Sequence, residues 1–279
     1  MLKQRGVSDS TKVIIVASGC TDLTPMIVRR IMSREPRVYL IEEEQRRGKT
    51  SAINKILANC KSELLALVDA DIRLPPETLW TVLRGFSDER VGVVGALPVI
   101  ENCDENLIAR SLSMISRIMT RALKELSLRE ELSFVMGETY CFRTKLIGRV
   151  PDGVVNDDAY VASYARSMGF KVILAPEAKF VVKVPSSIQD YIAQRRRVIF
   201  GHLQIKEKTG RFATSMEGIA LEYPSILLRA SIEEAALRPR SIWLALVNLE
   251  LEAFTRLFAL FDMRLGREHA RWRRIATTK

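Results

Sequence analysis

Apolar stretches with strand character alternate with amphipathic stretches through the first two thirds of the chain. The expected strands cover residues 12–18, 37–43, 63–71 and 91–99, and the expected helices cover residues 24–34, 49–60, 75–86 and 104–126. Short strands separated by helices of about 10–12 residues are typical of βαβ units, in which successive strands run parallel. The pattern therefore predicts an α/β fold, with a mostly parallel sheet flanked by helices. Ligands of such sheets bind beyond the carboxyl ends of the strands.

The pattern changes in the last third of the chain. Residues 187–208 form a basic helical stretch, and apolar helical stretches follow at 219–237 and 241–263. We therefore expect two regions, an α/β domain at residues 1–212 and a helical C-terminal region at residues 213–279.

The last apolar stretch contains charged residues. Glu250, Glu252 and Arg256 interrupt it, which argues against a lone helix that crosses a bilayer. A helix at the membrane interface, a span packed against another helix, and a helical hairpin packed on the protein's own surface all remain open.

Composition and charge narrow the classes of partner. The chain is 47% hydrophobic and 27% charged, as in globular proteins, and its 43 Lys and Arg against 33 Asp and Glu give a net charge of +10. This excess favours nucleic acid, an anionic membrane face or phosphorylated substrates. We expect no nucleic acid partner, because only 7% of the residues are aromatic and they are not interleaved with basic ones. The four distant cysteines fit reduced packing residues, and the first twelve residues lack the apolar core of a signal peptide.

Two carboxylates follow an apolar run where a ligand site is expected. Asp69 and Asp71 come directly after residues 64–68. In extended backbone, residues i and i+2 face the same way, so both could converge on one cation. Carboxylate pairs of this kind suit Mg²⁺ or Mn²⁺. The alternative is an ordinary turn, in which aspartate is common.

A glycine precedes the second expected helix, with basic residues around it. The segment RRGKT ends in Lys49 and Thr50, but a P-loop would need a glycine at position 43, where the chain has Glu43. A helix start with Lys49 beside it could still hold phosphate. A solvated helix start is the alternative.

Two further sites carry candidate chemistry. Asp157 and Asp158 precede a helical stretch, and their mutual repulsion would raise the pKa of one of them, as suits a general base. One of the two could instead be only the N-cap of that helix. Gln194 and Arg197 share one face of the basic helix, which would contact a diphosphate or simply be solvated.

The order of the motifs is more specific than any one of them. They recur as VIIVASGCTDLT, RRGKTSAIN, LLALVDADIRLPPETL, FVMGETYCFRTKLI, VVNDDAYVA and QRRRVIFG. Over about residues 12–208 this series resembles the family 2 glycosyltransferases with a GT-A fold. The resemblance implies an inverting transfer from a nucleotide-diphosphate sugar, with a divalent metal, Mg²⁺ or Mn²⁺, as cofactor.

The resemblance also implies a role for each candidate residue. Asp158 matches the catalytic base, with Asp157 beside it. Asp71 matches the metal ligand of the Asp-x-Asp motif, and Asp69 matches its partner, which faces the nucleotide ribose and the metal. The remaining implied contacts are with the nucleotide sugar, through Lys49, Ser18, Gln194 and Arg197, and with the acceptor, through Gly137 and Glu138.

The chain departs from the family pattern in three ways. The family's usual first strand and helix, about 25–40 residues, are missing before residue 12, so the strand at 12–18 would lack a neighbour. The aspartates that usually follow this strand are replaced by Ala17 and Ser18. Val198 replaces a tryptophan, which argues against processive polymer synthesis.

The C-terminal region is similar to that of membrane-associated family members. Its apolar stretches and the basic residues after them suit a helix at the cytoplasmic face of the cell membrane. The basic residues are Arg264, Arg267, Arg271, Arg273, Arg274 and Lys279. The expected acceptor is a lipid-linked sugar, a polysaccharide or a protein glycan. A catalytically inactive binding or scaffold protein is the alternative function.

Overall fold

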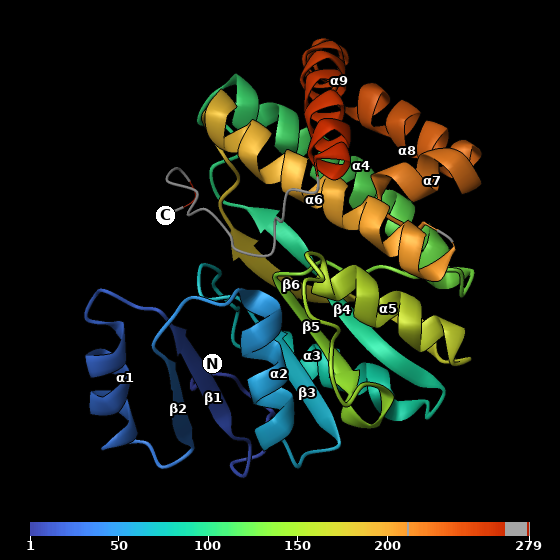
Figure 1. The fold of residues 1–279 in the computed structure, drawn as a ribbon. Helices are drawn as coiled ribbons and strands as arrows, with labels where there is room; N and C mark the ends of the chain where they lie inside the picture. Colours follow the sequence, from blue (N-terminus) through green and yellow to red (C-terminus); the bar gives the residue numbers. More distant parts are fainter. Residues whose placement is uncertain (211, 266–277, 279) are drawn as a thin grey trace.

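The computed structural model describes residues 1–210, 212–265 and 278 (Figure 1). Strands and helices alternate as expected through the first part of the chain. The strands are β1 (Val13–Ser18), β2 (Val38–Glu43), β3 (Leu64–Val68), β4 (Val91–Ile100), β5 (Thr139–Arg143) and β6 (Lys171–Val182). The helices are α1 (Thr24–Met32), α2 (Lys49–Asn59), α3 (Thr78–Arg84), α4 (Leu107–Leu128), α5 (Asp157–Ser167), α6 (Ile188–Thr209), α7 (Met216–Glu222), α8 (Pro224–Leu237) and α9 (Ser241–Arg264), with short 3₁₀ turns η1 (Gly85–Ser87) and η2 (Thr144–Leu146).

The sheet is mixed, whereas the sequence predicted a mostly parallel one. β5 runs antiparallel to β3 and to β4, which flank it, and β6 runs parallel to β4. The order is β3-β5-β4-β6. The 22 residues of α4 and the loop after it separate β4 from β5. A connection of this length can return the chain in either direction, so the alternation of elements did not fix the direction of β5.

The sheet is interrupted between β1 and β3. β1 pairs in parallel with β2 in a separate two-stranded sheet, and no described strand joins it to β3. The N-terminal residues pack instead against the start of α3, where the backbone N–H of Arg5 donates to the carbonyl of Pro76 at 2.7 Å. Among the described strands, β1 therefore pairs with β2 alone.

The C-terminal helices pack over one end of the β4–β6 region (Figure 1). The apolar stretch expected at 219–237 is broken, because Pro224 begins a new helix, α8, directly after Tyr223. Ile219 and Ile226 lie in the same apolar core as Leu123 of α4. The division into two domains at residue 212 stays a prediction.

None of the described helices combines the length and the apolar run that crossing a membrane requires. Of the basic residues expected to flank the membrane, Arg264 ends α9. The others lie outside the described residues: Arg267, Arg271, Arg273, Arg274 and Lys279.

Candidate active site

Asp69 and Asp71 follow β3 in a turn rather than in extended backbone. β3 ends at Val68, and Ala70 and Asp71 form the turn. The expectation that Asp69 and Asp71 face the same way because they alternate along a strand is therefore wrong. The backbone N–H of Asp69 donates to the carbonyl of Glu138 at 2.9 Å, which ties the turn to the start of β5, and Asp71 is exposed.

Lys49 lies among the acidic side chains. Its Nζ is 2.9 Å from Oδ1 of Asp69 and 3.5 Å from Oδ1 of Asp157, and it donates to the carbonyl of Gly137 at 2.9 Å. It is the first residue of α2, after Gly48, whose φ of 95° is open to glycine but strained for other residues. One ammonium group thus joins the end of β3, the approach to β5 and the start of α5.

Asp157 and Asp158 occupy the first turn of α5. Asn156 holds the N-cap position, and its side-chain amide donates to the carbonyl of Val198 on α6 at 3.0 Å. The interpretation of one aspartate as the N-cap is therefore wrong. The hydroxyl of Tyr140, on β5, donates to Oδ2 of Asp157 at 2.8 Å.

Burial raises the pKa of three carboxyl groups in this region, those of Asp69, Glu138 and Asp158. It raises the pKa of Asp158 well above the usual range, and the negative charge of Asp157 raises it further. Burial also raises the pKa of Asp69 to about 6, although Lys49 opposes this, and raises the pKa of Glu138. The rise at Asp158 was expected from crowding alone, but burial is its larger cause. A carboxylate with a raised pKa is a stronger base once ionised.

Arg197 brings α6 to the same region. Burial lowers the pKa of its guanidinium to about 10, while the charge of Asp69 acts in the opposite direction. Gln194 lies one helical turn earlier, at the i, i+3 spacing that places two residues on one face. Arg195 of the same helix is directed elsewhere, and its guanidinium binds Glu252 of α9.

Ser18 lies at the end of β1, in a neighbouring group of polar side chains. Burial would raise the pKa of Glu43, but the hydroxyls of Ser18 and Ser51 and the ammonium of Lys55 lower it by more. The hydroxyl of Ser51 donates to Oε1 of Glu43 at 2.9 Å. Ser18 thus lies beside Glu43, and its role with a nucleotide sugar stays a prediction.

Gly137 provides the space in which Asp158 lies. A Cβ atom at Gly137 would be 2.8 Å from Oδ2 of Asp158, closer than real Cβ atoms come. Glu138 follows it and is half-buried. The structure thus places both residues beside the acidic side chains, and their contact with an acceptor stays a prediction.

We call this group of five carboxyl groups and two cationic groups the carboxylate cluster. Its members are Asp69, Asp71, Glu138, Asp157, Asp158, Lys49 and Arg197. The carboxyl groups outnumber the cationic groups, and after burial the neighbouring carboxylates are a further cause of the raised pKa values of Asp69, Glu138 and Asp158. In the described parts of the chain, no three Asp, Glu, His or Cys side chains form a metal-binding group. Binding of a divalent cation by Asp69 and Asp71 therefore stays a prediction.

Tyr140 and Asn156 belong to the site although the sequence did not single them out. Tyr140 lies two residues after Glu138, and in extended backbone this spacing places two side chains on the same side. The spacing could therefore have identified Tyr140 as a residue of the site. Asn156 directly precedes Asp157, but its contact with α6 is visible only in the folded chain. Gly201 of α6 allows that contact, because a Cβ there would lie 2.4 Å from Cγ of Asn156.

Comparison with known protein families and curated proteins gives the following matches. The sequence model of the family described as Glycosyl transferase family 2 matches residues 2–150. Beta-monoglucosyldiacylglycerol synthase of Nostoc sp. is 29% identical over 97 residues, which are 34% of this chain and 21% of that protein. Succinoglycan biosynthesis protein ExoO of Rhizobium meliloti is 31% identical over 128 residues, which are 46% of this chain and 34% of that protein. The chain thus spans between a fifth and about a third of these curated relatives.

A solved structure resembles the chain over nearly its whole length. It is a mannosyltransferase from Pyrobaculum calidifontis in complex with GDP-Man and Mn²⁺, with a TM-score of 0.67 and 25% sequence identity. The match covers 96% of this chain and 81% of that one.

Proposed function

Because the chain belongs to glycosyl transferase family 2 and has a GT-A-like α/β fold, we propose that it transfers a sugar, with inversion, from a nucleotide-diphosphate sugar to an acceptor hydroxyl. The observation that carries the proposal is the carboxylate cluster. It brings a carboxylate of raised pKa, Asp158, within the same group as two cations, Lys49 and Arg197, at the end of β3. An inverting transfer needs both a base for the acceptor and positive charge for the leaving diphosphate.

Asp158 is the general base in this proposal. Its carboxylate takes the proton of the acceptor hydroxyl as the hydroxyl oxygen forms a bond to the anomeric carbon. The bond from that carbon to the diphosphate oxygen breaks on the opposite face, which inverts the configuration. Asp157, held by Tyr140 and Lys49, keeps negative charge beside the base. Gly137 and Glu138 border the position of the acceptor.

The donor side of the site follows from the remaining members. Asp69 faces the nucleotide ribose, Arg197 and Gln194 face the diphosphate, and Lys49 and Ser18 contribute to donor binding. Asp71, with Asp69, would hold Mg²⁺ or Mn²⁺, which would balance the charge of the diphosphate. The presence of Mn²⁺ and GDP-Man in the similar mannosyltransferase structure supports this assignment.

The acceptor is a glycan or a lipid phosphate in this proposal. The names of two similar proteins refer to a glucosyldiacylglycerol and to succinoglycan, and these support a lipid or polysaccharide acceptor. The test is to incubate the full chain with a panel of nucleotide sugars and Mn²⁺ or Mg²⁺ and to measure nucleoside diphosphate release. We expect metal-dependent release with one donor or a few. Donor binding without any release would instead support the inactive binding protein.

Asp71→Asn is expected to remove the metal dependence of donor binding. An exposed carboxylate is a good ligand for Mn²⁺, and the neutral amide is a poorer one. Loss of a residue that only supports a metal ligand costs about 10–100-fold in affinity, so we expect a loss of at least about tenfold here. Calorimetric titration of the donor with and without Mn²⁺ measures the effect. Asp104→Asn, in an exposed loop, is the control. Equal donor affinity in the wild type and the Asp71 variant would rule out this assignment.

Gly137→Ala is expected to lower turnover while leaving the fold near its wild-type stability. The added methyl group would displace the end of the Asp158 side chain and no backbone atom. A shift of about 1 Å in a reacting group can lower the rate about 100-fold. Turnover and melting temperature are measured together. Gly148→Ala is the matched control, because a Cβ there meets nothing within 4 Å. Wild-type turnover in the Gly137 variant would contradict the position given to the base.

A further inference from the structure

Helix α9 turns polar side chains toward the protein and large apolar side chains outward. Asn248 is buried, and its amide donates to the hydroxyl of Ser111 on α4 at 2.8 Å. Thr255 is fully buried. By contrast, Trp243 is 75% exposed and Leu257 is 67% exposed. A surface helix of a water-soluble protein shows the opposite distribution, with its apolar side facing the core.

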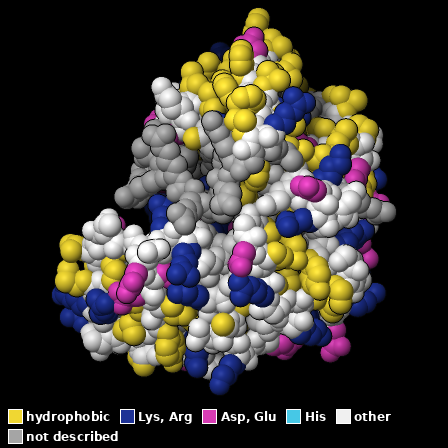
Figure 2. Space-filling model, viewed as in Figure 1, with side chains coloured by type: hydrophobic (Ala, Val, Ile, Leu, Met, Phe, Trp, Pro, Cys, Tyr) yellow, Lys and Arg dark blue, Asp and Glu magenta, His cyan; other side chains and the backbone are white. Residues whose placement is uncertain are grey.

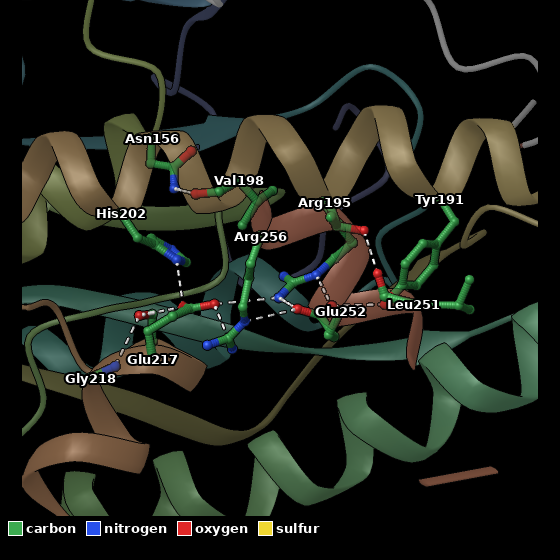
Figure 3. A network of polar contacts seen from close by, with 12 residues as sticks. Asn156, Tyr191, Arg195, Val198, His202, Glu217, Gly218, Leu251, Glu252 and Arg256 are labelled. Atoms are coloured by element: carbon green, nitrogen blue, oxygen red, sulfur yellow. Dashed lines mark hydrogen bonds and ion pairs between the residues drawn. The ribbon is translucent and has the colours of Figure 1, made fainter. Parts of the chain in front are cut away.

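Ionic contacts with α6 and α7 fix this orientation of α9 (Figure 3). Glu252 accepts from Nε of Arg195 at 2.5 Å and from the hydroxyl of Tyr191 at 2.7 Å, both on α6. Arg256 lies 3.6 Å from the carboxylate of Glu217 on α7. Rotating α9 to hide its apolar side would leave the half-buried Arg195 without Glu252, the nearer of its two carboxylate partners, which is costly. The apolar side chains therefore face outward because the polar ones are held inside.

The outward side chains form one surface, which we call the outer apolar face. It includes Trp243, Leu246, Leu249, Phe254, Leu257 and Phe261. Helix α8 adds Leu228 and Ile232, which are 61% and 59% exposed. Figure 2 shows hydrophobic side chains gathered at the end of the molecule where α8 and α9 lie in Figure 1. Apolar surfaces of this kind mark contacts with a membrane or with another protein.

Basic residues adjoin this face in the structure and in the sequence. Arg240 lies exposed between α8 and α9, and Arg264 ends α9. Residues 264–279 contain six Lys or Arg residues and one acidic residue, Glu268. Clusters of this composition next to an apolar helix are attracted to anionic lipid headgroups. A second copy of the chain would instead bring like charges together.

We propose that the outer apolar face docks in the plane of a bilayer surface that contains anionic lipid. Its side chains would enter the boundary between headgroups and acyl chains, while the arginines would contact the headgroups. The docking does not depend on the proposed sugar transfer. Helix α6 would then connect the docked helix with the carboxylate cluster. Its Arg195 binds Glu252 of α9, and its Arg197 belongs to the cluster.

Vesicle flotation of the full chain tests the proposal. The probes are vesicles of phosphatidylcholine alone and of phosphatidylcholine mixed with phosphatidylglycerol. The face variant is Trp243→Gln, Phe254→Gln and Leu257→Gln combined. The matched control is Leu23→Gln, Met26→Gln and Ile27→Gln combined, which removes exposed apolar side chains from α1 and the residue before it. Point variants are used because truncation would remove core residues such as Ile219 and Ile226. The melting temperature of each variant verifies its fold.

We expect the wild type and the α1 control to float with the anionic vesicles, and the face variant to bind at least about tenfold more weakly. Vesicles with brominated acyl chains should also quench the fluorescence of Trp243 in a chain that carries Trp80→Phe and Trp272→Phe. Equal flotation of the face variant would overturn the proposal, because the basic residues alone would then account for binding. A lipid-free dimer that the face variant converts to a monomer, with no vesicle binding by the wild type, would assign the face to a second copy. Sugar transfer is measured separately on a soluble acceptor analogue, so its absence leaves the flotation result interpretable.

Discussion

Asp158→Asn is expected to lower kcat by about 10²–10⁴-fold while donor binding survives. The amide cannot accept the proton of the acceptor hydroxyl, and loss of a positioned base costs a factor of this size. Donor binding should persist because Lys49 and Arg197, which are expected to contact the donor, are unchanged. The measurement is kcat from nucleoside diphosphate release, together with the donor dissociation constant from calorimetry.

The same substitution is expected to stabilise the fold above neutral pH. The folded state raises the pKa of Asp158 above its unfolded value, mainly through burial. The stability of the wild type therefore falls as the pH rises from the unfolded-state pKa to the folded-state pKa of this acid, because only the unfolded state ionises it freely in that interval. The difference in melting temperature between Asp158→Asn and the wild type should therefore grow with pH.

Asp157→Asn is the matched comparison for Asp158→Asn. Asp157 also lies in the first turn of α5, but its carboxylate is held by Tyr140 and Lys49. Its substitution should lower kcat by less, and should move the rise of the pH–rate profile to lower pH, because a like charge beside Asp158 is removed. A larger loss of kcat at Asp157 than at Asp158 would reverse the assignment of the base.

Lys49→Met is expected to destabilise the fold by about 3 kcal/mol and to abolish measurable donor binding. The ammonium group of Lys49 is the close partner of the half-buried carboxylate of Asp69 and of the buried carboxylate of Asp157. Removing one partner of a buried ion pair leaves an uncompensated charge, whereas methionine restores only the length of the side chain. The destabilisation should shrink at low pH, where Asp69, with its pKa of about 6, can become protonated.

Urea denaturation at several pH values measures this effect. Lys55→Met on the same helix is the control, because Lys55 pairs with Glu43 outside the carboxylate cluster and is more exposed. It should cost less and leave donor binding intact. If Lys49→Met unfolds at the wild-type urea concentration and binds donor normally, Lys49 is not the cation that holds this cluster together.

The parts of the fold that depend on local pattern could be predicted from the sequence. The apolar run before Asp69 formed β3 as expected, although the strand ends at Val68 and leaves Asp69 and Asp71, which were expected within it, in the turn that follows. The direction of β5 could not be predicted, because a five-residue strand after a long connection carries no periodic signal for its orientation. Pro224 was a local signal for the break in the 219–237 stretch and could have been used.

The candidate site was predicted as far as its residue types, but not its internal contacts. The motif order gave Lys49, Asp69, Asp157 and Arg197, which the structure brings together. The contact of Lys49 with the carbonyl of Gly137 joins residues 88 apart in the chain, and no spacing rule reveals such a pair. The sequence likewise did not reveal that Asn156, and not an aspartate, holds the N-cap position of α5, or that its side-chain amide donates to the carbonyl of Val198 on α6.

The interruption between β1 and β3 divides the molecule into parts that should open at different rates. β1 and β2 hydrogen-bond only to each other among the described strands, and Val13 and Ile14 are half-buried, whereas Val93 and Val94 of β4 are fully buried. Elements with few buried contacts unfold locally at lower free energy than the core. We therefore expect the amide hydrogens of β1 to exchange with solvent deuterium well before those of β4. Glu43 at the end of β2 contacts Ser51 of α2, two residues after Lys49. Donor binding at Lys49 should therefore slow this exchange, and part of the binding free energy would be used to order β1 and β2.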